Sequence, residues 1–523
     1  MSIRSFLALA ASFAALALPA TAAAELRVGV TDDLGRGAPD GGVAFLGALT
    51  DLGFSENRIS VVWDPAAPPS LEEHLQLERY VATAGLTGVR VVLAVYPARP
   101  TAIADTPDGA ARFAAFVATL ASTHPQVTDF IVGNEPNQPR FWRPQYAGDG
   151  APLACASYAA TLAASYDALK AVNPAITVVG VGLSPRGNDN PLAPDNSSTS
   201  PVRCLHSIGV AYRASGRTKP LMDELAFHAY PESDTQPFGA TYAWPKAGLM
   251  DLSRIKQAVW DAFNGTAQPT FAERGRSVLL PGLTMRVAEV GWQVGIVPSA
   301  QPLYVGTENV STTDEGSQAN AYAQTIRLLE CDPSVKSLLF FGLQDETDLS
   351  RWQAGLMRAD GTTRPSYDSV KAALATSRGV CTGTHVSWTH VTHVEGASAR
   401  FSKTRGTVPA RTTRWALAAG AKEDATFTAG IFRLARTPAS RQAQRLIGRS
   451  LAGASVLPRP ALRLTGRVKA PWGRQIIFPQ RRLKAGTYLY AIRLAAEMNP
   501  ARATVLMSKP FRVGAARKPG RKR

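Results

Sequence analysis

Two glutamates at the ends of expected strands are the residues whose type and placement best suit chemistry. Glu135 stands between Asn134 and Pro136 at the end of a short apolar run, and Glu289 ends another such run. Proline cannot donate to a sheet ladder, so we expect the first run to stop at Pro136 with Glu135 at its carboxyl end. Two carboxyl groups about 5 Å apart can hydrolyse a glycosidic bond by double displacement, whereas a wider gap leaves room for a water and gives inversion.

The charges of such a pair compete at close range. Two unit charges about 5 Å apart in an effective dielectric of about 20 repel by roughly 3 kcal/mol, or about two pK units. One carboxyl group should therefore keep its proton near neutral pH and act as the acid. We expect the chain to fold so that Glu135 and Glu289, 154 positions apart, face each other across one gap.

The scaffold for this pair is predicted by eight alternations of strand-like and helical patterns between Glu25 and about Arg378. The strand-like runs are short, continuous and rich in Val, Leu and Phe, as parallel strands covered on both faces should be. Eight such units predict a (β/α)8 TIM barrel, whose chemistry lies at the carboxyl ends of the strands. A doubly wound sheet is the alternative, but no Gly-x-Gly-x-x-Gly turn follows a strand. The expected strands are 26–32, 58–64, 89–96, 130–135, 176–183, 225–230, 285–290 and 335–343, with helices such as 110–122, 155–172 and 318–330.

Four motifs in barrel order carry a resemblance to a known group of enzymes. The run 134–142 holds Asn-Glu-Pro-Asn followed by Phe-Trp, 58–63 is Arg-Ile-Ser-Val-Val-Trp, 228–231 is His-Ala-Tyr-Pro, and Glu289 ends the seventh strand. Together they resemble the retaining glycoside hydrolases of clan A. The first is similar to family 39, the β-xylosidase and iduronidase type, and the second to family 5, the cellulase and mannanase type.

The resemblance implies a role for each matching residue. Glu135 would be the general acid/base and Glu289 the nucleophile. Asn134 would bind the sugar 2-hydroxyl, a contact that strengthens in the transition state. Tyr230 would hydrogen-bond Glu289, and Arg58 would keep Glu289 ionised and oriented. The group needs neither cofactor nor metal.

Other candidate residues have a structural alternative beside the functional one. His228 would contact the sugar or be a satisfied core histidine, and Arg58 would serve the site or pair with Asp64. Sugar C–H faces stack on aromatic rings, so Trp292 and Trp352 are the expected subsite floor, with core packing as the alternative. The acidic loop of Asp345, Glu346 and Asp348 is expected to be a solvated face, with a cation or an amino sugar as its alternative ligand.

Two departures from the resemblance bear on subfamily and substrate. Gly133 stands where a Trp often precedes the Asn-Glu-Pro motif. Tyr96 stands at the third-strand end, where family 5 often has His. Neither changes the expected reaction.

The amino end of the chain has the pattern of a secretory signal. Residues 1–24 combine Arg4, an apolar stretch over 6–20 and three alanines before Glu25. The stretch is too short and too Ala-rich for a good membrane span, which favours a cleaved signal over the alternative of an uncleaved anchor. No later run reaches the roughly 18 apolar residues of a transmembrane helix. We expect a barrel over 25–382 in a secreted, extracellular protein, with association with the cell surface left open.

Beyond residue 382 the pattern changes. Short, near-alternating β-rich runs at 386–391, 414–419, 425–429 and 486–494 are punctuated by turn residues. They predict an antiparallel β-sandwich over 383–514. Its last hairpin, 483–513, resembles that of a fibronectin-type or immunoglobulin-like module. Residues 515–523 are expected to be a disordered basic tail.

Four cysteines suit an oxidising compartment and allow three connectivities. None forms a Cys-x-x-Cys pair, so no zinc site is expected. The expected strands place Cys155 and Cys204 in loops on one barrel face, and Cys331 and Cys381 at the opposite face. We therefore expect the pairs 155–204 and 331–381, with free buried thiols as the alternative.

The net charge of +17 is unevenly distributed along the chain. From Thr384 onward the net charge is +24, and before it the net charge is −7. This asymmetry marks a domain boundary. The basic part is expected either to be a solvated surface or to hold an anionic cell-wall or capsular polymer. Nucleic acid is not an expected partner, because an exported chain with no recognition motif has no reason to meet it.

These observations predict a secreted, monomeric, retaining glycoside hydrolase that cleaves O-glycosidic bonds, β-linked, in an oligo- or polysaccharide. The main alternative is a non-catalytic carbohydrate-binding or cell-surface adhesion protein built on a decayed hydrolase barrel. Transglycosylation by the same site is a third interpretation.

Overall fold

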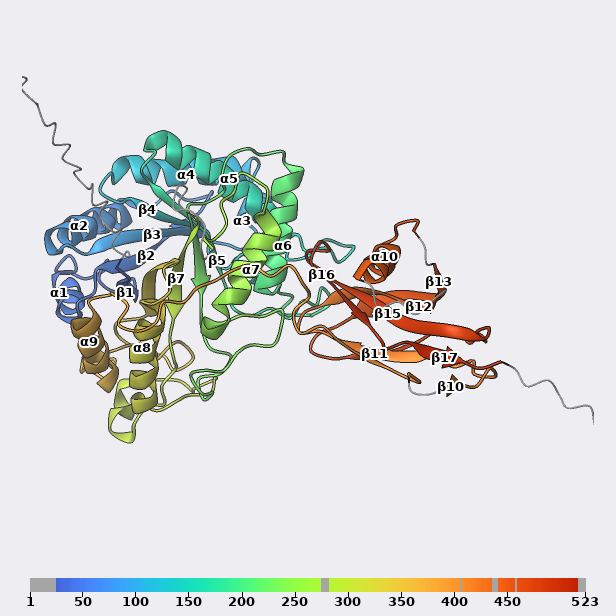
Figure 1. Cartoon of the computed structure of the whole chain (residues 1–523). Helices are drawn as coiled ribbons and strands as arrows, with labels where there is room; N and C mark the ends of the chain where they lie inside the picture. The colour runs from blue at the N-terminus through green and yellow to red at the C-terminus, as the bar shows by residue number, and fades with distance from the viewer. Residues whose placement is uncertain (1–24, 274–281, 405–406, 435–440, 457–458, 516–523) are drawn as a thin grey trace, which may run out of the picture.

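The computed structural model describes residues 25–273, 282–404, 407–434, 441–456 and 459–515. The expected signal segment and the expected tail from 516 onward lie outside the described residues. Eight parallel strands close into a barrel in the order β1 to β8, with helices around it (Figure 1), so the predicted TIM barrel is confirmed. The strands are β1 (Arg27–Thr31), β2 (Glu56–Trp63), β3 (Arg90–Pro97), β4 (Asp129–Val132), β5 (Thr177–Leu183), β6 (Glu224–His228), β7 (Thr284–Val290) and β8 (Val335–Phe341).

The outer helices bury one apolar face each against the strands. The helix α2, for example, turns Leu77, Tyr80 and Val81 inward and begins with a capping box between Ser70 and Glu73. None of the described helices is both long and apolar enough to span a membrane. The helices of the barrel are α1 (Val43–Leu52), α2 (Leu71–Thr87), α3 (Ala102–Asp105), α4 (Gly109–Thr123), α5 (Ala154–Val172), α6 (Pro201–Ala214), α7 (Leu252–Phe263), α8 (Glu315–Leu329) and α9 (Pro365–Ser377), with 3-10 turns η1 (Leu249–Asp251) and η2 (Pro298–Leu303).

Several strands end earlier than expected, and two of these ends, those of β4 and β6, carry the functional motifs. The strand β4 stops at Val132, and beyond it Gly133 and Glu135 take positive φ angles of 81° and 38°, outside the extended region of a regular strand. The strand β6 stops at His228, so Tyr230 lies in the loop that follows it. Both functional motifs therefore lie at strand ends that curl over the barrel mouth.

The floor of the barrel is charged. The guanidinium of Arg286 is fully buried among the carboxylates of Glu56 at 2.7 Å, Asp129 at 2.8 Å and Glu224 at 3.1 Å. Arg27, the first residue of β1, pairs with Glu56, and Arg90, the first residue of β3, pairs with Asp129. Three arginines therefore balance three carboxylates. An apolar layer lies within the barrel as well, formed by Val92, Ala94, Ile131, Val179, Ala226 and Ala288. We call these six acidic and basic residues the charged floor: Arg27, Glu56, Arg90, Asp129, Glu224 and Arg286.

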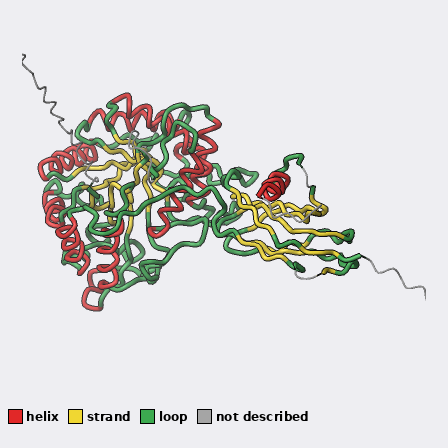
Figure 2. The backbone as a smooth tube through the Cα atoms, viewed as in Figure 1, coloured by secondary structure: helices red, strands yellow, loops and turns green. Residues whose placement is uncertain are grey.

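The C-terminal part consists mainly of two sheets (Figure 2). Trp415, Leu417, Phe427, Tyr490 and other apolar side chains of both sheets form one core between them. The larger sheet contains β10 (Thr407–Val408), β12 (Ala425–Leu434), β13 (Pro460–Val468), β15 (Gly486–Ala496), β16 (Ala503–Met507) and β17 (Phe511–Val513), and the smaller sheet contains β9 (Ser398–Phe401), β11 (Ala416–Gly420) and β14 (Arg474–Ile477).

Two details of the sandwich differ from expectation. The helix α10 (Arg441–Leu451) interrupts the strands and packs on the outer side of the larger sheet. The run 386–391 forms no strand, because it lies along the barrel instead. There Val386 donates its N–H to the Cys331 carbonyl at 2.7 Å, and His390 stacks on Trp260 with ring centroids 3.9 Å apart.

Ion pairs join the sandwich to the barrel. Arg502, which precedes β16, binds Asp261 of α7 at 2.8 Å, and Asn499 donates to the same carboxylate at 2.9 Å. Arg203 of α6 binds Asp424 at 2.9 Å. The two units therefore meet along α6 and α7.

Two disulfides lie in the barrel and have the expected pairing. Cys155 is joined to Cys204 and Cys331 to Cys381, and the described residues contain no free cysteine. Cys155 and Cys204 lie in the first turns of α5 and α6 and not in loops, so this bond joins one helix to the other.

Candidate active site

The two predicted glutamates meet at the carboxyl end of the barrel. His228 lies beside both, with its Nδ1 2.8 Å from Glu135 Oε1 and 3.4 Å from Glu289 Oε2. One oxygen of each carboxylate and one ring nitrogen of His228 lie within 4.8 Å of one another. Two carboxyl groups this close can act on the two sides of a single bond.

Glu289 is the more enclosed carboxylate, with 8% of its surface exposed. Arg58 Nη1 lies 2.5 Å from Oε1, and the Tyr230 hydroxyl donates to Oε2 at 3.0 Å. Burial by itself would raise the pKa of Glu289, but His228 and Arg58, together with the hydrogen bonds from Arg58 and Tyr230, outweigh it and lower the pKa below its ordinary value. Glu289 is therefore an ionised carboxylate at neutral pH.

Arg58 also fixes the neighbour of the other glutamate. Its Nη2 donates to Asn134 Oδ1 at 2.7 Å. The contact turns the amide nitrogen of Asn134 away from Arg58, where it can donate to a ligand. One guanidinium thus holds Glu289 directly and orients the residue beside Glu135, which suits its planar fork of donors.

A register irregularity aims Glu289 into the barrel. Arg286 and Ala288 of β7 face the interior, so strict alternation would turn Glu289 outward. The pairing of β7 with β6 shifts after Phe227, so that Glu289 pairs with His228. Such a bulge re-aims a side chain at a barrel rim.

Glu135 is held by a strained backbone. Its φ of 38° lies in the left-handed region, and its N–H donates to the Gly182 carbonyl at 2.9 Å. The adjacent Val181 has a φ of 80°, an outlier for a β-branched residue. The Tyr158 hydroxyl accepts from the Val181 N–H at 2.8 Å and donates to the Val132 carbonyl, which ties the ends of β4 and β5 together. Strain of about 1–3 kcal/mol per residue persists only where the surroundings impose it, and it clusters at functional sites.

The two predicted tryptophans lie in different surroundings. Trp352 is half-buried and stacks on Tyr230, with ring centroids 5.1 Å apart and planes at 26°. Trp292 is 4% exposed and packs against Phe238 and Tyr322. The structure therefore brings Trp352 to the site, while Trp292 lies in the adjoining core without a described contact to either glutamate.

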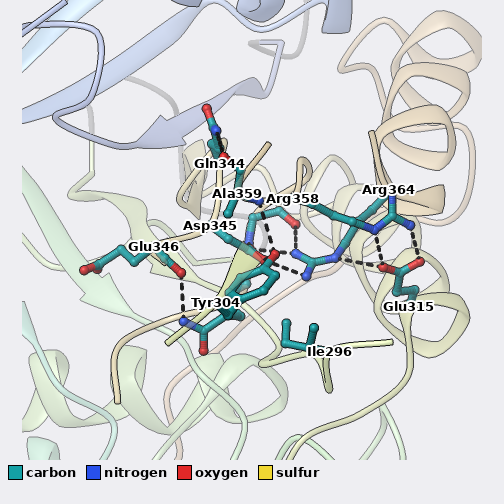
Figure 3. Close-up of polar contacts among 12 residues, drawn as sticks. Ile296, Tyr304, Glu315, Gln344, Asp345, Glu346, Arg358, Ala359 and Arg364 are labelled. Carbon is teal, nitrogen blue, oxygen red and sulfur yellow. Dashed lines mark hydrogen bonds and ion pairs between the residues drawn. The ribbon is translucent and has the colours of Figure 1, made fainter. Parts of the chain in front are cut away.

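The acidic loop after β8 is only partly solvated. Asp345 is buried and accepts from both Nη atoms of Arg364 at 2.6 Å and from the Tyr304 hydroxyl at 2.7 Å. Figure 3 shows Arg364 between Asp345 and Glu315. Glu346 remains exposed as expected, but the expectation of a solvated face is wrong for Asp345, because Arg364 follows 19 positions later and folds back onto it. This ion pair anchors the loop that carries Trp352.

Among the described residues, the closest set of metal-ligating atoms is that of Glu135, His228 and Glu289. Arg58 already places its positive charge on Glu289, and Tyr230 occupies the other carboxylate oxygen. The donor set therefore does not suit a metal ion.

The chain matches no family model and no curated protein. Among solved structures it is similar to a family 39 glycoside hydrolase from the gut symbiont Bacteroides cellulosilyticus WH2, with 16% identity over 80% of this chain and 74% of that one and a TM-score of 0.47. It is also similar to GH5_18 from Streptomyces cattleya (16% identity, 74% and 85% coverage, TM-score 0.43) and to a glucosidase from Croceicoccus marinus (11%, 88% and 94%, TM-score 0.44). Structural similarity at this low sequence identity and TM-score is no evidence of function, which depends on the geometry of the site.

Proposed function

We propose that the chain is a retaining glycoside hydrolase that cleaves β-linked oligo- or polysaccharides, with Glu135 as general acid/base and Glu289 as nucleophile. The observation that carries this proposal is the separation of the two carboxylates, whose nearest oxygens lie within 4.8 Å. Double displacement uses a separation of about 5–5.5 Å, whereas inversion needs about 6.5–9.5 Å to admit a water.

In the first step the Glu289 carboxylate attacks the anomeric carbon. The glycosidic C–O bond breaks as Glu135 gives its proton to the leaving oxygen, and the sugar becomes an ester of Glu289. In the second step Glu135, now a carboxylate, takes a proton from a water molecule that attacks the same carbon. The ester bond breaks, Glu289 leaves as a carboxylate, and the configuration of the sugar is retained.

The neighbours of the two glutamates support these roles. Arg58 and Tyr230 hold both oxygens of Glu289, which keeps it ionised and aimed. His228 contacts Glu135 through Oε1, so Oε2 is the oxygen that serves the leaving group. The amide nitrogen of Asn134 is placed to donate to a sugar hydroxyl, and Trp352 offers an aromatic face beside Tyr230.

The nucleophile is tested with a panel of aryl β-glycosides on the wild type and on Glu289→Ala. We expect the variant to be inactive and azide to restore turnover with an inverted glycosyl azide as product. A wild type that cleaves none of the panel yet binds glycans would support the non-catalytic alternative. Activity in Glu289→Ala without azide would remove Glu289 from the mechanism.

The acid is tested by the leaving group. Glu135→Gln keeps the size of the side chain and removes its exchangeable carboxyl proton. Substrates with poor leaving groups should therefore lose far more activity than activated aryl glycosides, which need little protonation. Equal losses on both substrate types would contradict the assignment.

We also infer that the protein is exported. The signal-like pattern of residues 1–24 and the two disulfides support this, because disulfides persist in oxidising compartments. Fractionation of the producing cells, with antibody detection of the chain, tests it, and a cytoplasmic full-length chain would overturn it.

A further inference from the structure

One face of the C-terminal sandwich collects arginines. Arg463 and Arg467 of β13 and Arg493 of β15 alternate with core residues such as Leu462 and Ile492, so they point out of the larger sheet. The strand register sets these arginines among threonines: Arg467 pairs with Thr426, and Thr428 pairs with both Thr465 and Arg493. We call Arg463, Arg467 and Arg493, with the threonines between them, the arginine face.

The helix α10 covers one end of this face and leaves the rest open. Ile447 and Leu451 of α10 pack on Phe432 and Leu489 of the larger sheet. Figure 1 shows α10 beside β12 and β15. The exposed side chains of Arg445 and Arg449 lie one helical turn apart on α10. The helix α10, which borders the arginine face, therefore adds two further positive charges beside it.

The positive charge of the face is only partly neutralised by the acidic residues of the C-terminal part. The chain has four acidic residues after Thr384, and two of them, Glu423 and Asp424, are engaged by Arg502 and Arg203 at the barrel junction. Near the face, Glu497 lies 3.7 Å from Arg467. Uncompensated like charges on one surface repel one another, so an anionic partner would stabilise them.

A chain of contacts links one end of the arginine face to the barrel mouth. Asp424, immediately before β12, accepts from the N–H of Ala470 in the loop that follows β13, and that loop also carries the exposed Trp472. Asp424 binds Arg203, which also pairs with Asp189 in the loop between β5 and α6. Carbonyl groups of that same loop accept from the Asn137 amide, two residues beyond Glu135. Contacts thus connect the end of the arginine face with the segment that holds the proposed acid.

We propose that the arginine face binds a linear, carboxylate-bearing polysaccharide and holds it beside the barrel mouth. The choice of a polysaccharide rests on the proposed function. Guanidinium groups bind carboxylates through two parallel hydrogen bonds, and threonine hydroxyls can bond to sugar hydroxyls. Nucleic-acid strands are held on aromatic stacking platforms, and membranes need an apolar face; the arginine face has neither.

The binding test uses the full chain with Glu289→Ala, so that the polymer stays intact. The probe is polygalacturonate, with dextran as the neutral polymer. The variant Arg463→Gln/Arg467→Gln/Arg493→Gln should weaken binding of polygalacturonate by about tenfold, since each exposed charge pair contributes only modestly to the binding free energy. Its matched control is Arg400→Gln/Arg411→Gln/Arg414→Gln, which removes the same charge from exposed arginines in and next to the smaller sheet. Thermal unfolding of both variants checks that they fold.

The expected result is strong, salt-sensitive binding of polygalacturonate, no binding of dextran, and a loss confined to the first variant. Equal losses in the two variants would show general attraction to a basic surface and would overturn the proposal. So would the absence of binding, or equally tight binding of duplex DNA or anionic vesicles. If the polymer binds but the wild type cleaves no aryl glycoside, this proposal is supported and only the proposed function is contradicted.

Discussion

Arg58 connects the surroundings of the two glutamates, because it binds both Glu289 and Asn134, the residue next to Glu135. Arg58→Met removes its charge but keeps its apolar stem. The pKa of Glu289 should then rise, so the acidic limb of the kcat/KM profile moves to higher pH. Removal of one oriented donor typically costs 10²- to 10³-fold in rate, and we expect a loss of roughly that size.

The same pKa governs stability. Because the folded pKa of Glu289 lies below its ordinary value of 4.5, the ionised group stabilises the fold above about that pH, and the contribution is lost as the pH falls through the folded pKa. Arg58→Met should flatten this dependence in urea unfolding at several pH values. Arg79→Met, on the exposed side of α2, is the control and should change neither profile. A shift of the acidic limb to lower pH would contradict the assignment of Arg58.

At the scale of elements, the ends of β4 and β5 determine where Glu135 lies. Tyr158→Phe removes the hydroxyl that accepts from Val181 and donates to Val132, leaving buried backbone groups unpaired. We expect a loss of about 1–3 kcal/mol in the free energy of unfolding. We also expect a fall in kcat larger than the change in KM, because the strained turn at Glu135 loses its support.

Tyr212→Phe is the matched control for that variant. Tyr212 is a buried tyrosine of α6 whose hydroxyl donates to the Lys219 carbonyl at 2.9 Å, away from the site. It should lose stability without a comparable loss of kcat. A kcat that falls equally in both variants would mean that the link between β4 and β5 does not position the acid.

The number of strands and their approximate positions were predictable from the sequence, whereas their exact ends and the direction of their side chains were not. The alternation of apolar runs and helical spacing indicates eight units, and Pro136 indicates the end of the fourth run. The inward turn of Glu289 depends on a bulge between β7 and β6, and register is a property of two strands that no single run reveals. The same holds for the charged floor, where Arg286 meets Glu56 from 230 positions away.

Two elements of the C-terminal part show how local pattern is overridden. The run 386–391 alternates like a strand, but Trp388 packs against the barrel core and draws the segment away from the sheets. The helix α10 is rich in Arg and Gln and has only a narrow apolar stripe, with Ile447 and Leu451 four positions apart. Packing of that stripe on the larger sheet, and not composition, explains why the helix forms there.

At the scale of the whole molecule, the two disulfides lie at opposite ends of the barrel, one at each end. Their loops span 49 and 50 positions, for which the chain-entropy model gives about 4 kcal/mol each. We expect Cys155→Ser/Cys204→Ser and Cys331→Ser/Cys381→Ser each to lower the free energy of unfolding by about 2–4 kcal/mol. Urea unfolding measures it, with the two variants serving as controls for each other. A loss below about 0.5 kcal/mol in either would mean that its bond constrains little of the unfolded chain.

The charge asymmetry along the sequence predicts a domain boundary near residue 384. The contacts that join the two parts could not be read from it, since Arg203 meets Asp424 and Arg502 meets Asp261 only after both parts have folded. The arginine face likewise exists only because β12, β13 and β15 pair in one register.

The charged floor has a practical consequence for handling the protein. Arg286, Glu56 and Asp129 are almost wholly shielded from solvent, so dissolved ions cannot screen their attraction. At molar ionic strength the screening length in water is about 3 Å, which would release a polyanion from a surface without touching this buried network. Concentrated salt should therefore elute the protein from a column of immobilised polyanion while its barrel remains folded.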